Sequence, residues 1–472
     1  MKAKKLLALF IVFALFATSS AYIVLADDPP EGAQIQDMYS SWASWDIFMA
    51  ENVYGLGNRG TYSNFRGTFT DGKFLPVYES LTEKFDADIG LEVSDSNDEA
   101  VTRGEIVSAL YGVISEVLKT DSDISAIDYF IENGLINGRA SGDYQLDQNC
   151  TTEEMIIFSV RVYEYLCYEL KLDSKGLFWK ITGENLPNTV YLLGTIHTGD
   201  ASIYPLSKVM LEAFDNSAYL GVEANVYTMD EEDVDYMIAG QMITGGGTIR
   251  DYISEETYEL YKEVAESFGI SADTYDHTKP WAAATLIQNA MTADNATSFT
   301  LGMDMFFLAK AVNSSKNIVE IESVKYQIDM FNSFSNELQE MLLLSTISPP
   351  LAQEGEDSLS LEDMAQLASA YAAYLLEAVR TGDEAALTQI LIAAKNYTDP
   401  FMTESLMVEY ITKLWDIRDA AMAAAIERYL TDEDAEGDFF VAVGAGHTVG
   451  PTGIVNVLRE KGYTVVFLGG TD

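Results

Sequence analysis

The stretch YLLGTIHTGD at Tyr191–Asp200 ends a short apolar run with a glycine, and a histidine follows three residues later. A second stretch, VAVGAGHTVG at Val441–Gly450, repeats the same order. The chain has only three histidines in 472 residues, so this one local frame contains two of them. A glycine lets the backbone turn sharply and approach a ligand closely. We therefore expect two matching strand ends, each followed by a histidine.

The residues around these stretches alternate between strand and helix patterns. KGLFWKITGENLPNTVYLLGTIH (175–197) predicts a hairpin of two apolar strands. YPLSKVMLEAFDNS (204–217) predicts a helix, AYLGVEANV (218–226) predicts another strand, and the chain closes as strand, helix and strand. Residues of about 228–300 and 326–430 have mostly helical patterns. This order predicts an α/β fold with a mixed, partly parallel sheet and a helical cap.

Three residues fall at the ends of predicted strands: His197, Glu223 and His447. In open α/β sheets, ligand sites collect beyond the carboxyl ends of the strands. Two imidazoles and a carboxylate are a common ligand set for a divalent metal, with a position left for water. The alternative is that each histidine is only a hydrogen-bonded loop residue. Two histidines at the same position of two matching stretches favour a functional site instead. His277, in YDHTKPW, lacks the preceding strand and glycine, and we expect it to be structural.

The segment from about 175 to 468 resembles the TraB/GumN family, the Tiki-like group. The matching motifs occur in order and include YLLGTIHTG, LGVEAN, KPW, LGMD, EIESVKYQ, IRDAAM and GAGHTVGPTGIVNVLREKGYTV. The resemblance implies a metal-dependent site made of two Gly-x-x-His motifs and a glutamate, which are His197, His447 and Glu223 here. It also implies a peptide as substrate or ligand, since some members are metalloproteases and others limit the activity of peptide pheromones.

Three more residues match motifs of that family. Glu322 and Gln327 lie in EIESVKYQ, and we expect Glu322 to be the general base and Gln327 to lie beside the substrate. Arg418 lies in IRDAAM, but Asp419 follows it where the family usually has Asn, which leaves a substrate-binding role for Arg418 open. No HExxH helix is present, so the geometry of ordinary zinc proteases does not apply.

Residues 27–172 predict a separate, all-helical domain. Two Thr-capped amphipathic helices are expected, with capping boxes at Thr102 and Glu105 and at Thr151 and Glu154. VTRGE and ENGLINGRASGDYQLD resemble S-layer homology repeats, over about residues 36–172. That resemblance implies binding of cell-wall polysaccharide through Arg103. The second copy has Thr152 at the matching position, and a helical domain that only packs on its neighbour is the alternative.

The first 26 residues have the charged start, apolar middle and small-residue end of a secretory signal, with the cut expected after Ala26. An uncleaved membrane anchor is the alternative.

The net charge of −46 argues against nucleic acid as a partner, because no basic patch could offset the repulsion of phosphates. Cys150 and Cys167 are about 25 Å apart along one predicted helix, so we expect two free thiols. The predicted signal indicates a secreted or cell-surface protein.

The paired histidine motifs, the signal and the family resemblance together imply an exported hydrolase that acts on peptides and depends on a divalent metal such as Zn, Mn or Co. A cell-surface protein that sequesters a peptide or other ligand without turnover is the alternative, and product formation separates the two. If His197 and His447 hold one ion, their ring nitrogens should lie within about 4 Å of each other. Glu223 should then reach the same ion rather than pair with a lysine or arginine.

Overall fold

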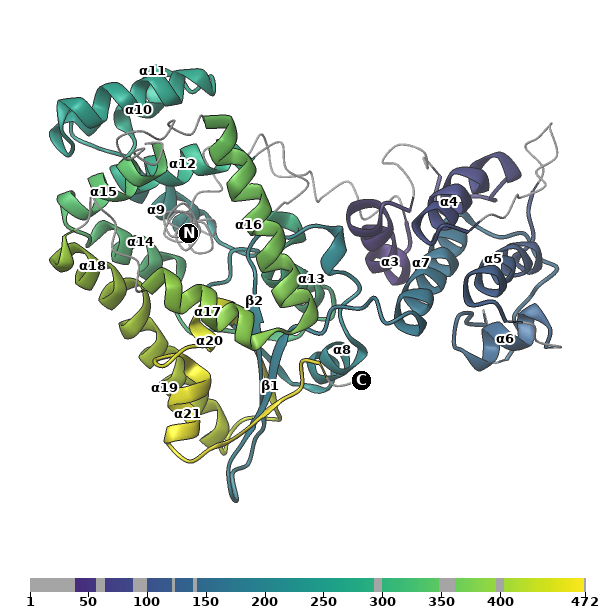
Figure 1. Cartoon of the computed structure of the whole chain (residues 1–472). Helices are drawn as coiled ribbons and strands as arrows, with labels where there is room; N and C mark the ends of the chain where they lie inside the picture. Colours follow the sequence, from purple (N-terminus) through teal and green to yellow (C-terminus); the bar gives the residue numbers. More distant parts are fainter. Residues whose placement is uncertain are drawn as a thin grey trace. The chain divides into compact units, whose positions relative to one another are not determined.

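The computed structural model describes residues 39–56, 64–87, 100–120, 124–138, 142–292, 299–347, 361–395 and 403–470 (Figure 1). The chain divides into two compact units, Asp27–Asp173 and a unit that contains Ser174–Asp472. The predicted signal, residues 1–26, lies outside the described residues. Among the described helices, none has the length and apolar character needed to cross a membrane.

The first unit is helical, and its two longest α-helices after residue 100 begin as predicted. Thr102 caps α5 (Arg103–Leu118) and Thr151 caps α7 (Thr152–Glu169), each with a complete capping box. Cys150 and Cys167 are free and buried, which confirms the prediction for the thiols. The other described helices of this unit are η1 (Ser41–Ala43), α3 (Ser44–Phe48), η2 (Met49–Tyr54), α4 (Asp71–Lys84) and α6 (Ala126–Glu132).

The second unit is built on a six-stranded sheet with the strand order β4-β3-β5-β2-β1-β6. Three neighbouring pairs, β4-β3, β3-β5 and β5-β2, are parallel, and β1 is antiparallel to both β2 and β6. The predicted hairpin is β1-β2, and the predicted mixed α/β class is confirmed. The strands are β1 (Leu177–Thr182), β2 (Val190–Thr195), β3 (Tyr219–Val222), β4 (Asn317–Glu320), β5 (Phe439–Gly444) and β6 (Thr464–Phe467).

Helices occupy most of the remaining residues of this unit, and many of them gather in the predicted cap (Figure 1). They are η3 (Ala201–Ile203), α8 (Lys208–Asn216), α9 (Glu231–Gln241), η4 (Ile249–Asp251), α10 (Glu255–Ser267), α11 (Ala272–His277), α12 (Pro280–Thr292), η5 (Phe299–Leu301), α13 (Met303–Asn313), α14 (Val324–Asn332), α15 (Asn336–Ile347), α16 (Leu361–Thr381), α17 (Glu384–Lys395), α18 (Glu404–Ile411), η6 (Thr412–Asp416), α19 (Ile417–Thr431), α20 (Ala445–Thr448) and α21 (Ile454–Glu460).

The central strand β5 shows why the core needs helices on both faces of the sheet. All six of its residues are buried. Phe440 packs against Phe214 of α8 and Phe307 of α13, with ring centroids 5.5 and 4.7 Å away. Phe439 instead stacks on Tyr429 of α19, at 4.5 Å. Because successive strand residues point to opposite faces, both faces of β5 are covered, which explains its unbroken apolar sequence.

Four parallel strands end at one edge of the sheet and place the predicted site there. His197 follows β2, His447 follows β5, Glu223 follows β3 and Glu322 follows β4. The carboxyl ends of neighbouring parallel strands lie together, so the topology gathers residues that are far apart in the sequence. Strand β4 was not predicted, because its sequence NIVE has only two apolar residues between polar ends and none of its residues is buried.

Candidate functional site

His197 is held by a carboxylate from the cap. Its Nδ1 lies 3.0 Å from Oδ2 of Asp304, in the first turn of α13, and the hydroxyl of Thr195 donates to Oδ1 of the same carboxylate at 2.6 Å. A carboxylate only accepts, so Nδ1 of His197 is the donor. Burial disfavours the imidazolium, but the charge and hydrogen bond of Asp304, aided by Glu223, outweigh it and raise the pKa of His197 to about 9. The same pair lowers the pKa of Asp304 despite its burial.

A glycine brings Asp304 to this position. Gly302, in the motif LGMD, lies against the backbone of His197, and a Cβ there would collide with its carbonyl group, 2.8 Å from the carbonyl carbon. The N–H of Met303 donates to the carbonyl of Ile196 at 3.1 Å. The motif therefore joins the start of α13 to the loop after β2, with Asp304 facing the histidine.

Glu223 accepts hydrogen bonds from a network of donors. The N–H of Gly444 donates to its Oε1 at 2.6 Å, and the guanidinium of Arg418 donates to its Oε2 at 2.7 Å. Arg418 also donates to both oxygens of Glu322, at 2.8 and 2.9 Å. The amide of Gln327 donates to Glu223 and to Glu322 at 3.2 Å. Two buried carboxylates thus share one buried guanidinium, and despite burial they raise the pKa of Arg418.

His447 has its own carboxylate and no exposed surface. It lies in the short helix α20, and its Nδ1 is 2.5 Å from Oδ1 of Asp419, with side-chain exposures of 0% and 1%. Its ring centroid is 5.2 Å from that of Trp415. Gly194 makes room for this helix, since a Cβ there would lie 3.0 Å from Cα of Ala445. The glycine of the first motif therefore allows the second motif to pack beside it.

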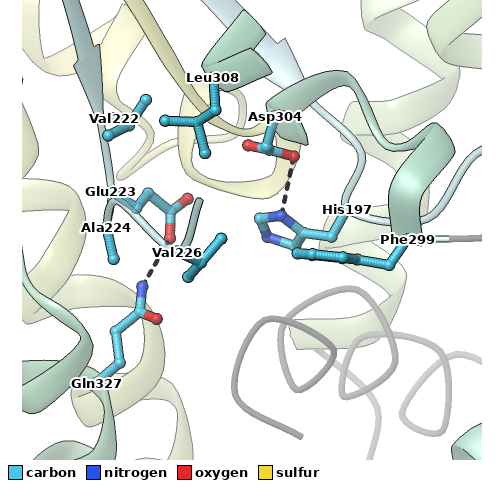
Figure 2. A pocket seen from close by; sticks show the side chains of 9 residues that line it. All are labelled: His197, Val222, Glu223, Ala224, Val226, Phe299, Asp304, Leu308 and Gln327. Carbon is cyan, nitrogen blue, oxygen red and sulfur yellow. Dashed lines mark hydrogen bonds and ion pairs between the residues drawn. The ribbon is translucent and has the colours of Figure 1, made fainter. Parts of the chain in front are cut away.

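A small pocket lies between His197 and Glu223. Figure 2 shows their side chains facing each other across the pocket. Asp304 bonds His197, and Gln327 bonds Glu223. His197 and Glu223 are 6% and 7% exposed, and the pocket volume is about 20 Å³, which is enough for one water molecule. The lining residues are His197, Val222, Glu223, Ala224, Val226, Phe299, Asp304, Leu308 and Gln327. His447, Glu322 and Arg418 are not among them.

The predicted metal set fits this arrangement only in part. Both histidines bind a carboxylate through Nδ1, as metal-ligating histidines usually do. Glu223, however, is paired with Arg418, the arrangement that a shared ion was expected to exclude. Within the described ranges, no three His, Cys, Asp or Glu side chains are placed to hold a metal ion. As they stand, His197, Glu223 and His447 therefore do not fit a three-ligand metal centre.

The structure gives different surroundings to the remaining predicted residues. Gln327 lines the pocket and donates a hydrogen bond to Glu223, and its role beside the substrate stays a prediction. Glu322 is engaged at both oxygens by Arg418, which leaves it a poor general base. Arg418 is 2% exposed and faces the two glutamates rather than the pocket. His277 contacts the carbonyl of Gly247 through Nδ1, at 3.2 Å.

Sequence reasoning missed the two aspartates that hold the histidines. Asp304 was visible only as the last letter of LGMD, and Asp419 only as a departure from the usual Asn. Neither has a local sequence signal, because each meets its histidine through the fold.

In the first unit, Arg103 lines a cavity of about 400 Å³, together with Trp42, Asn137, Gly138, Glu154, Ile157, Phe158 and Arg161. Arg103 is 2% exposed. It donates to the carbonyls of Tyr144 and Asn137, at 2.9 and 3.0 Å, and to Glu154 at 2.5 Å. Its guanidinium therefore helps to build the cavity wall.

Comparison with known proteins gives a family for the second unit. The sequence profile of the TraB/PrgY/gumN family matches residues 177–466. An uncharacterized protein of Treponema pallidum is 22% identical over 291 residues, which cover 60% of this chain and 80% of that protein. The uncharacterized protein YbaP of Escherichia coli is 25% identical over 154 residues, 32% of this chain and 56% of YbaP. The chain thus spans about half the length of YbaP. No solved structure matches. The profile does not cover the first unit, where the S-layer resemblance stays a prediction.

Proposed function

The chain belongs to the TraB/PrgY/gumN family, and we propose that it is an exported hydrolase that acts on peptides at the pocket between His197 and Glu223. One observation carries the proposal: a histidine oriented by Asp304 faces Glu223 across a pocket with room for a water molecule. A titratable residue with a perturbed pKa, oriented by a carboxylate and placed in a pocket, is a typical feature of acid–base sites.

His197 has the properties of a general acid in this arrangement. With a pKa of about 9, its imidazole carries a proton at neutral pH. Water in the pocket would attack the peptide carbonyl carbon and give up its proton to Glu223, while His197 would donate its proton to the leaving amide nitrogen as the C–N bond breaks. Asp304 would hold the orientation of the ring. The divalent metal that the sequence predicts, Zn, Mn or Co, stays a separate proposal. The present placement of Glu223 does not fit such an ion, and the acid role of His197 does not require it.

Product formation tests the proposal. The purified chain is incubated with a peptide library, with and without Zn, Mn or Co, and the products are identified by mass spectrometry. We expect cleavage by the wild-type chain and none above background by His197→Gln or Glu223→Gln. His277→Gln is the matched control, because His277 does not line the pocket, and it should cleave like the wild type. An intact library under every metal condition would contradict hydrolysis.

A non-catalytic binder is the second candidate, and the network at Glu223 favours it. Each carboxylate oxygen of Glu223 and Glu322 already accepts a hydrogen bond from Arg418 or from the N–H of Gly444, which favours binding over proton transfer. A protein of this kind would sequester a peptide or another ligand without turnover. Saturable, stoichiometric binding of a peptide that stays intact after long incubation with metal would support this candidate over the hydrolase.

We also propose that the first unit attaches the protein to cell-wall polysaccharide. The cavity beside Arg103, with the exposed indole of Trp42 and the second guanidinium of Arg161, supports the proposal. Deletion of residues 27–172 should release the protein from isolated cell walls and leave any peptide cleavage unchanged. Equal retention of the full and shortened chains on the walls would contradict attachment.

A further inference from the structure

The disagreement between the predicted metal set and the observed network centres on Arg418. This side chain is 3% exposed and is bonded to two carboxylates, those of Glu223 and Glu322, which are 8% and 3% exposed. A buried carboxylate requires a compensating charge or several donors. In this unit the guanidinium supplies the charge, and Gln327 and the N–H of Gly444 supply further donors.

We infer that Arg418 is a built-in counter-ion that competes with a divalent cation for Glu223. The inference rests on the proposed function only in taking Glu223 as part of the site. The Oε2 atom of Glu223 accepts from Arg418 at 2.7 Å, so an ion that used this oxygen would have to displace the guanidinium. An ion bound nearby would also be repelled by the positive charge of Arg418, strongly so in a buried environment.

The bidentate pair with Glu322 explains why Arg418 stays in this place. Parallel Nε and Nη2 bonds of 2.8 and 2.9 Å fix the plane of the guanidinium, and the remaining direction of Nη2 reaches Glu223. Glu322 is thereby a positioning residue for Arg418. Removing the guanidinium without removing the glutamates would leave two buried carboxylates that share no cation, which is a favourable setting for a divalent ion with oxygen ligands.

Metal affinity of the full chain tests the inference, with Mn²⁺ as the probe. The chain is first stripped of metal with a chelator, and binding is then measured by equilibrium dialysis with no peptide present. We expect Arg418→Met to bind Mn²⁺ at least tenfold more tightly than the wild type. Adding Glu223→Gln to Arg418→Met should remove this gain. Arg418→Lys keeps the charge and should stay within about threefold of the wild type.

A matched control separates the site from the overall charge of the chain. Arg250→Met removes a guanidinium paired with Glu255 on the surface, where the two side chains are 43% and 68% exposed. It changes the net charge by the same amount as Arg418→Met, and we expect its Mn²⁺ affinity to stay within twofold of the wild type. An equal gain in both variants would overturn the inference, because it would be a general charge effect.

Two further results would overturn the inference. One is an Arg418→Met chain that folds and binds Mn²⁺ no more tightly than the wild type. The other is a wild-type chain whose Mn²⁺ binding weakens tenfold or more on Glu223→Gln alone, since that carboxylate would then already serve a metal. The second comparison can still overturn the inference if Arg418→Met does not fold. Because no peptide is used, peptide cleavage can fail or succeed independently of these results.

Discussion

The two Gly-x-x-His segments share a local sequence but differ in their surroundings. His197 lies in the loop after β2, lines a pocket and is bonded to Asp304 from α13. His447 lies in α20, has no exposed surface and is bonded to Asp419 from α19. The shared frame thus specifies a strand end and a histidine, whereas the partner and the solvent access come from the elements packed around each segment.

The sheet register accounts for part of this difference. In the β2-β5 pair, Gly194 lies opposite Val443 and Thr195 lies opposite Gly444, so the two motifs are offset by one residue. Beyond Gly444 the chain turns directly into α20, and beyond Thr195 it runs as a loop towards η3. Equivalent residues of the motifs therefore do not meet across the sheet, and an alignment of the two segments overstates their symmetry.

Substitution of the two aspartates should give the largest difference in stability between the two segments. Asp419→Ala leaves His447 without its carboxylate in a place closed to solvent, and we expect it to lower the free energy of unfolding by about 3–5 kcal/mol. Asp304→Ala should lower it by about 1–3 kcal/mol, because water in the pocket can reach the polar groups left behind. Urea unfolding measures both values. A larger loss of stability for Asp304→Ala than for Asp419→Ala would contradict the view that the His447–Asp419 pair is the one closed to solvent.

The pH dependence of stability should reveal that His197 and Asp304 form an ion pair. The folded-state pKa of His197, about 9, is above the unfolded value of about 6.5. The contribution of His197 to the free energy of unfolding is therefore fully present below pH 6.5 and is lost as the pH rises through 9. It amounts to about 3 kcal/mol. In metal-free protein, the difference in unfolding free energy between the wild type and His197→Gln should shrink by this amount between pH 6 and pH 10. A constant difference over that range would show that His197 is not ionised by Asp304.

The glycines should show a smaller contrast between the segments. An alanine Cβ at Gly302 would collide with the backbone of His197, which cannot move without shifting Asp304. We expect Gly302→Ala to cost about 2–3 kcal/mol. A Cβ at Gly194 would meet Ala445 and Thr448 at 3.0 Å, close enough to require a small shift of α20, and Gly194→Ala should cost about 1 kcal/mol. Thermal unfolding of the two variants tests this order, and the reverse order would count against it.

The sequence predicted the positions of the candidate site better than its bonds. Alternating strands and helices were enough to place His197, Glu223 and His447 at strand ends, because that depends on local patterns. The pairing of Glu223 with Arg418 could not be predicted, since it joins the end of β3 to α19 across most of the unit's sequence. The same is true of Asp304, which reaches His197 only because Gly302 allows a close approach of backbones.

The central claim is that the reactive histidine is the one that faces the pocket. Peptide turnover per folded molecule, measured for His197→Gln beside its control His277→Gln, tests it most directly. The account predicts that His197→Gln lowers kcat at least about 100-fold, the effect of losing a positioned general acid, and that His277→Gln keeps the wild-type rate. A His197→Gln chain that cleaves peptides at more than half the wild-type rate would contradict the account.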